Sequence, residues 1–148
     1  MKASHVRGFT LIELVVVITI LGILAAFAIP RFITLDSTAR IATVNGLSGT
    51  VSSAAALARS LSMATASTTS VTMEGNAVSL ANNYPDASAT GIGTAINASS
   101  NFALTTTGTA NATTGTAVWK LQTNCQVTYT PAQSAGATPS VAVTTSGC

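Results

Sequence analysis

The longest apolar run in the chain covers residues 9–30, and a single charged residue, Glu13, interrupts it before residue 30. About 20 predominantly apolar residues in a helix are enough to cross the hydrocarbon core of a bilayer. A charged side chain at membrane depth costs about 2.5 to 3.5 kcal/mol on insertion scales, so it is expected to have a partner and a role. The pattern therefore predicts a membrane-spanning helix in which Glu13 is the candidate functional residue.

A second helical pattern follows without a clear break. Over residues 36–63, apolar residues recur at spacings of three or four, which is typical of an amphipathic helix with one buried stripe. We expect one helix over residues 9–63, bent or loosened around Gly22 and Pro30, because glycine is a weak helix former and proline removes a backbone donor. The predicted stripe consists of Ile41, Val44, Leu47, Val51, Ala54, Leu57 and Leu61.

From residue 64 onward the chain is rich in turn-forming and β-favouring residues. Residues 71–73 and 77–80 flank Glu74-Gly75-Asn76, which is typical of a hairpin. Residues 97–115 are rich in Asn, Ser and Thr and are expected to form a loop. Three further strands are predicted over residues 116–121, 126–130 and 140–145, with Trp119 and Tyr129 packing against the helix. The fold class is therefore α+β: a long bent amino-terminal helix packed on a small antiparallel sheet.

Charge is scarce in this chain of 148 residues. Charged residues make up 7% of it, against about 25% in an ordinary soluble domain, and the formal net charge is +2. Nucleic-acid binding requires clustered Lys and Arg, so no dedicated nucleic-acid site is expected. Low charge also removes the repulsion that keeps proteins apart, which favours self-association.

The two cysteines, Cys125 and Cys148, have 22 residues between them. In an exported protein they would be oxidised, and a disulfide closing such a loop contributes on the order of 3 kcal/mol. The alternative is a pair of free buried thiols. A metal site is not expected, because two cysteines and His5 cannot supply a closed set of ligands.

No catalytic arrangement is recognisable. The one histidine, His5, lies at the extreme amino terminus, so the rest of the chain has no Ser/His or Cys/His pair. Glu74 and Asp86 are lone acids beside Gly and Pro, which is typical of solvated turn residues. Gly91-Ile92-Gly93 lacks the last glycine of a dinucleotide-binding fingerprint. We predict that the chain is not an enzyme and has no cofactor.

The short basic stretch that ends in Arg7-Gly8, followed by Phe9-Thr10-Leu11-Ile12-Glu13 and an apolar helix, resembles the start of a type IV prepilin. The resemblance implies that a prepilin peptidase cuts between Gly8 and Phe9, that Phe9 is then N-methylated, and that Glu13 is retained for filament assembly. It also implies that the helix around Gly22 and Pro30 loses helicity on assembly.

The same resemblance implies an organisation and a location. Residues 1–8 would be a cleaved leader, 9–30 a transmembrane and filament-core helix, 31–63 the amphipathic half of that helix, and 64–148 a β-rich head with a disulfide loop at 125–148. The precursor would sit in the inner membrane of a Gram-negative bacterium and then join an extracellular pilus. Its partners would be other copies of itself, the peptidase and the assembly machinery of the inner membrane.

The spacing of Glu13 has a physical interpretation. Cleavage would leave a cationic amine on Phe9, and Glu13 lies one helical turn further on, on the same face. Two unit charges about 4 Å apart attract by roughly 4 kcal/mol at an effective dielectric constant of 20, which is comparable to the insertion cost. The pair could form within one subunit or between neighbours. Alternatively, Glu13 is simply tolerated near the membrane edge, where it could reach the interface.

Three further interpretations remain. The order of the helix, the hairpin, Asn83-Tyr84-Pro85 and the final cysteine loop resembles the mannose-sensitive haemagglutinin type of pilin. A pseudopilin of a type II secretion system shares the amino-terminal motif, although major pseudopilins usually lack the disulfide loop. A protein of another class, a secreted binding protein, would arise if a signal peptidase cut after Ala28, where Ala26-Phe27-Ala28 matches the small-residue pattern.

Overall fold

A computed structural model describes residues 8–148, with residues 29–33 described by their backbone alone. The first seven residues of the predicted leader lie outside the described part. The chain divides into two compact units, one ending at Ser37 and one running from Thr38 to Cys148. Helix α1 (Leu11–Thr65) extends through the first unit and into the second.

Helix α1 ends where its local sequence stops supporting helical geometry. Ala66 has a φ of 52°, a left-handed conformation that terminates helices, and the Ser67 amide donates back to the Ser62 carbonyl at 3.1 Å. The α1 backbone is helical through Gly22 and Pro30. The predicted loss of helicity in this segment on assembly stays a prediction.

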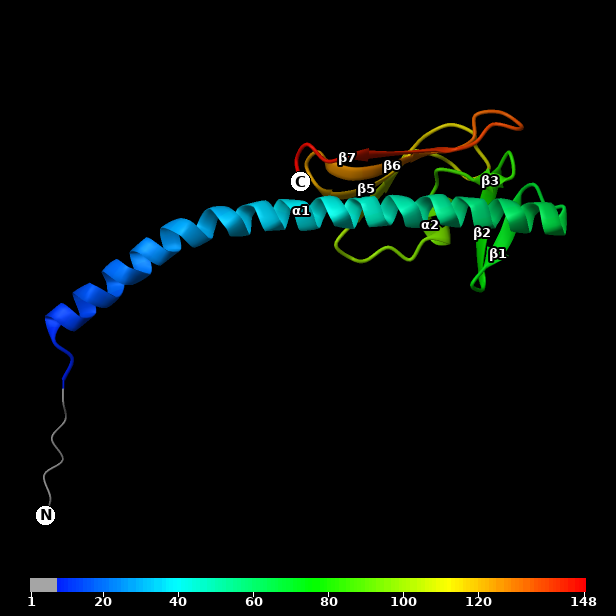
Figure 1. Ribbon diagram of the computed structural model, residues 1–148. Coiled ribbons are helices and arrows are strands. Elements are labelled where there is room, and N and C mark those ends of the chain that lie inside the picture. Colours follow the sequence, from blue (N-terminus) through cyan, green and yellow to red (C-terminus); the bar gives the residue numbers. More distant parts are fainter. Residues whose placement is uncertain (1–7) are drawn as a thin grey trace, which may run out of the picture. The chain divides into compact units, whose positions relative to one another are not determined.

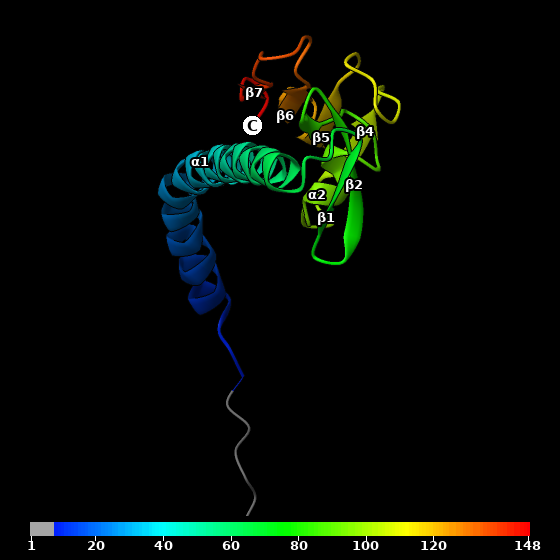
Figure 2. The same cartoon turned by 90° about the vertical axis from the view of Figure 1, so that its right-hand side faces the viewer.

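Two antiparallel sheets follow α1 in the second unit (Figures 1 and 2). Their α+β arrangement confirms the predicted fold class, and the predicted hairpin and three carboxyl-terminal strands are all present. The first sheet has the order β1 (Ser70–Met73), β2 (Asn76–Ala81) and β3 (Tyr84–Pro85). After the short helix α2 (Ile92–Ala95), the second has the order β4 (Ala103–Thr106), β5 (Ala117–Gln122), β6 (Cys125–Thr130) and β7 (Ser140–Thr144).

Strand β4 lies inside the stretch 97–115 that was predicted to be a loop, so that prediction was wrong. The first three residues of β4 are exposed, and the strand occupies an edge of its sheet. Its backbone pairs with β5, for example Leu104 with Trp119. A strand held by backbone pairing and largely exposed has little alternation of apolar and polar residues, which is the signal on which sequence-based assignment relies.

The buried face of α1 differs from the predicted stripe beyond Val51. Val44, Leu47 and Val51 are buried as expected, but Leu57 is 54% exposed and Ala54 and Leu61 are half-buried. The buried positions continue instead at Ala55, Ala58 and Ser62. Ala58 packs against Val71, Val78 and Leu80 of β1 and β2, whereas Ala55 belongs to the main core.

The main core lies between α1 and the inner face of the four-stranded sheet. Trp119 and Tyr129 are buried there, as predicted, together with Val44, Val51 and Val127. Burial raises the pKa of the Tyr129 hydroxyl well above its usual range, and the nearby Asp86 and Tyr84 raise it further. The hydroxyl therefore keeps its proton, which it donates to the Pro85 carbonyl oxygen at 2.7 Å.

Asp86 is fully buried, which contradicts its interpretation as a solvated turn residue. One carboxylate oxygen accepts hydrogen bonds from the amide and hydroxyl of Ser88 at 2.9 and 2.5 Å, and the other accepts from the Asn111 amide at 2.7 Å. Because a Cβ on Gly91 would lie 2.0 Å from the Asp86 Oδ1 atom, this arrangement requires glycine at position 91.

Asn111, which donates its backbone amide to Asp86, also donates its side-chain amide to the carbonyls of Thr69 and Leu80. Asp86 thus ties a long loop to the first sheet through hydrogen bonds that sequence inspection did not reveal.

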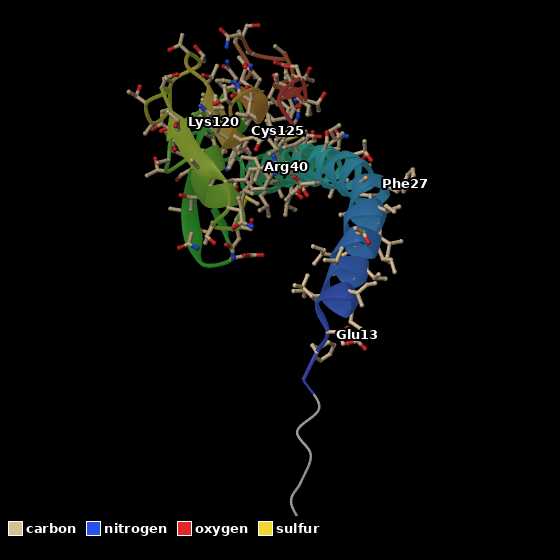
Figure 3. All side chains as sticks on the ribbon, turned by 90° about the vertical axis from the view of Figure 1, so that its left-hand side faces the viewer. Glu13, Phe27, Arg40, Lys120 and Cys125 are labelled. Carbon is tan, nitrogen blue, oxygen red and sulfur yellow. A yellow bond between two sulfur atoms is a disulfide. The ribbon has the colours of Figure 1, made fainter. Side chains whose placement is uncertain are left out.

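A disulfide joins Cys125 to Cys148, with the two Cα atoms 4.9 Å apart. A second link lies beside it, because Arg40 on α1 donates to the Gln122 side-chain oxygen at 2.5 Å and Gln122 donates to the Gly147 carbonyl. The disulfide loop is therefore attached to α1 as well as to its own sheet. Arg40 and Cys125 are both labelled in Figure 3.

The shift of the buried face predicts different effects for two truncations on the same helix. Val51→Ala should lower the free energy of unfolding by about 1 to 3 kcal/mol, because it opens a cavity in the core. Leu57→Ala should change it by less than about 0.5 kcal/mol, because that side chain is largely exposed. Fluorescence of Trp119, the chain's one tryptophan, would follow denaturation of the full chain in detergent micelles. Equal losses in the two variants would show that the originally predicted stripe is the buried one.

Candidate assembly site

Within the described residues of its own unit, no element covers the amino-terminal part of α1. The segment Leu11–Ala28 is long and apolar enough to cross a membrane by length and composition, and none of it is buried. Figure 3 shows its side chains projecting outward around the whole helix. A contiguous apolar surface of this extent marks a membrane or protein interface, since soluble monomers rarely expose one.

Glu13 caps the start of this helix. Its Oε2 atom accepts hydrogen bonds from the Thr10 backbone amide and from the Thr10 hydroxyl, both at 2.8 Å. The Thr10 hydroxyl oxygen also accepts a bond from the Glu13 amide at 3.3 Å. This reciprocal pattern is a capping box, in which the Ser or Thr before the helix and the acid three residues later satisfy each other's backbone donors. The carboxylate therefore has hydrogen-bond partners before any cleavage.

The predicted cleavage bond lies just before the helix. Gly8 and Phe9 are exposed and non-helical, and the Phe9 side chain is 90% exposed. A peptide bond outside regular structure is open to a peptidase, since its backbone groups are not tied into a helix. Along the helix itself, Phe9, Ile12, Glu13, Val16 and Val17 border a shallow apolar depression of about 340 Å³. The carboxylate thus sits on an apolar face.

Sequence analysis missed the role of Thr10, although Thr10-x-x-Glu13 is a readable capping-box signature. Of the other predicted site residues, Gly22 and Pro30 lie within the α1 backbone, and Cys125 and Cys148 form the disulfide of the second unit. Among the described residues, no group of three or more His, Cys, Asp or Glu side chains could hold a metal ion.

Parts of the chain are similar to known proteins. Residues 3–29 match the family model of the prokaryotic N-terminal methylation motif. The chain is 52% identical over 52 residues to the type IV narrow pilus major component PilA5 of Thermus thermophilus, covering 35% of this chain and 45% of that protein. It is 74% identical over 27 residues to the type IV major pilin protein PilA of Myxococcus xanthus, covering 18% of this chain and 12% of that protein.

The chain therefore carries an N-terminal methylation motif of the prokaryotic kind at the start of a long apolar helix. Over the matched residues, the chain is similar to type IV pilins. The matched segments span less than half the length of either relative. The narrower resemblance to the mannose-sensitive haemagglutinin type stays a prediction. No solved structure matches the chain significantly.

The capping box predicts that Thr10→Ala weakens the first turn of α1. Loss of an N-cap hydroxyl costs about 1 kcal/mol, which corresponds to an about fivefold larger equilibrium constant for opening of the first turn and so to about fivefold faster amide exchange. Hydrogen exchange of the Glu13 amide in detergent micelles would measure it. Thr10→Ser is the matched control, because serine supplies the same hydroxyl. Unchanged exchange in the alanine variant would show that the capping box does not hold the turn.

Proposed function

We propose that this chain is the structural subunit of an extracellular type IV pilus. The observation that carries the proposal is the entirely uncovered Leu11–Ala28 segment with one carboxylate near its start, directly after a Gly8-Phe9 bond outside the helix. A helix of this kind requires either lipid or copies of itself around it. A subunit that moves from membrane to filament core uses both environments in turn.

The proposed sequence of events begins in the inner membrane of a Gram-negative bacterium. Prepilin peptidase cuts after Gly8, Phe9 is N-methylated, and the helix remains in the bilayer until the assembly machinery transfers it into a growing filament. The segment around Gly22 and Pro30 loosens during this transfer. The β-rich head faces outward, and the pilus serves attachment to surfaces or motility.

In this proposal Glu13 changes partners when the leader is removed. Before cleavage its carboxylate is held by Thr10, so it is partly satisfied by hydrogen bonds while in the membrane. After cleavage a cationic amine is available on Phe9, and its positive charge would add a Coulomb attraction to the carboxylate that the uncharged donors of the cap do not supply. If that amine belongs to the neighbouring subunit, the pair sets the axial position of one helix relative to the next.

The Cys125–Cys148 disulfide favours a pilus over a pseudopilus, because major pseudopilins usually lack such a loop. A secreted binding protein starting at Ile29 would discard the segment that carries the methylation motif, which matches residues 3–29. We therefore retain the pilus as the single proposed function. The haemagglutinin-type subgroup is the form of pilin that we propose for the head.

Mass spectrometry of the mature amino-terminal peptide from the native organism tests the processing step. We expect a peptide that begins at Phe9 and carries one added methyl group, because the resemblance to type IV prepilins implies a cut between Gly8 and Phe9. A start at Ile29 would instead indicate an ordinary secreted domain, and the pilus proposal would be wrong.

Removing the carboxylate tests the assembly step. Glu13→Ala should leave cleavage intact but lower the amount of subunit in sheared surface filaments at least tenfold, measured by immunoblot against total cellular subunit. Glu13→Gln is the matched variant, because it keeps a side-chain oxygen for the capping box but removes the charge. We expect it to fail in assembly too. Normal filament yield from Glu13→Gln would mean that capping, rather than charge pairing, is the function of Glu13.

A further inference from the structure

The unit from Thr38 to Cys148, which the structure describes throughout, has five charged side chains. Three of them are engaged within the fold: Arg40 binds Gln122, Asp86 is buried, and the Arg59 guanidinium lies 4.7 Å from the centroid of the Tyr84 ring. The other two, Glu74 and Lys120, are exposed and form no ion pair within the described residues. They have opposite signs.

Glu74 lies at the tip of the β1–β2 hairpin, beside a groove lined by both polar and apolar residues. The groove has a volume of about 620 Å³ and runs between α1, the hairpin and residues 94–97. Leu57, Leu61 and Met73 are among its lining residues, as is Glu74 itself. The exposed Leu57 is therefore part of a concave surface of mixed polarity that includes a carboxylate.

The backbone at Glu74 is in an unfavourable conformation for this residue type. Its φ is 49°, and the next residue, Gly75, has a φ of 83°, so both central residues of the two-residue turn are left-handed. Such turns strongly prefer Asn, Asp or Gly at the first position. A glutamate there is locally strained, and residues kept in strained conformations often serve a function. A carboxylate on a longer stem at the hairpin tip is suited to reach a partner.

Lys120 lies on a different surface. It is on β5, where the neighbouring Trp119 is buried against α1, so by strand alternation Lys120 points to the outer face of the sheet. Its cross-strand neighbours are Ala103 on β4 and Gln126 on β6, and neither is charged. Figure 3 labels Lys120 on this sheet, whereas Figures 1 and 2 show the β1–β2 turn extending away from it, below the level of α1.

We propose that Lys120 of one copy docks against the Glu74 groove of a second copy of this chain. The ammonium would pair with the Glu74 carboxylate, while the four-carbon stem of the lysine would cover apolar surface at Leu57 and Met73. Because Lys120 lies on the four-stranded sheet and Glu74 on the hairpin of the other sheet, the contact joins unlike surfaces and is heterologous. Heterologous contacts that do not close into a ring generate open helical assemblies. The inference rests on the proposed pilus function and names the surfaces through which the heads would meet.

Charge reversal tests the pair in the native bacterium, with the variant chain replacing the natural one. Glu74→Lys and Lys120→Glu each place like charges opposite one another, and each should lower the ratio of filament subunit to cellular subunit at least tenfold. The double reversal has the same net charge as the natural chain and restores opposite signs. We expect it to return the ratio to within about twofold of the natural value, because like charges across an interface repel strongly and a swapped pair attracts.

Glu74→Asn separates an interaction from a structural role. Asparagine tolerates the left-handed conformation, so this variant should raise the melting temperature of the head while lowering filament yield. A purely structural residue would move both quantities in the same direction, and that result would overturn the inference. So would full filament yield in both single reversals, or equal loss in the single and double reversals while the natural chain forms filaments. Absence of filaments from the natural chain itself would overturn the proposed function, and the inference with it.

Discussion

One helix that is covered along only part of its length is the constraint on which the rest of this structure depends. Each square ångström of apolar surface removed from water contributes roughly 25 cal/mol, so an 18-residue apolar helix left in water is strongly unfavourable. The second half of α1 removes its own apolar side chains from water within the second unit, by packing on two sheets. The first half must find its covering outside its own unit, either in lipid or in other copies.

The packing of the second half also determines which apolar residues remain outside. Ala55 and Ala58 allow the sheets to approach the helix closely, and the row of larger residues next to them, Leu57 and Leu61, is left beside the hairpin. The groove is thus a by-product of close packing through small side chains. In a chain with so few charges, a carboxylate beside that groove and a lysine on the outer face of the four-stranded sheet stand out electrostatically. Each keeps its charge available because the other cations and the buried carboxylate of this unit already have partners.

The sequence was sufficient for features that depend on local pattern. The apolar run with Glu13, the Glu74-Gly75 hairpin and the three last strands all have strong periodic or turn signals, and the structure contains each of them.

The sequence was insufficient where residues distant in the chain decide whether a segment forms a strand or a side chain is buried. Strand β4 exists because β5 supplies its hydrogen bonds, and Asp86 is buried because Ser88 and Asn111 satisfy its oxygens. The rotation of the buried face toward Ala55 could not be foreseen, because two adjacent rows on the helix both have spacings of three and four. Thr10 was missed although its capping-box spacing was visible.

The position of the disulfide has a mechanical consequence. Strands β6 and β7 pair over five residues, from Gln126 with Thr144 to Thr130 with Ser140. At one end of this ladder the chain itself connects the strands through residues 131–139, and at the other end the Cys125–Cys148 bond joins them. A strand pair that is closed at both ends cannot be unzipped one rung at a time by a pulling force. A force that pulls β7 away from β6 must therefore break all of their backbone hydrogen bonds together. This makes the edge strand of the sheet more resistant to tension.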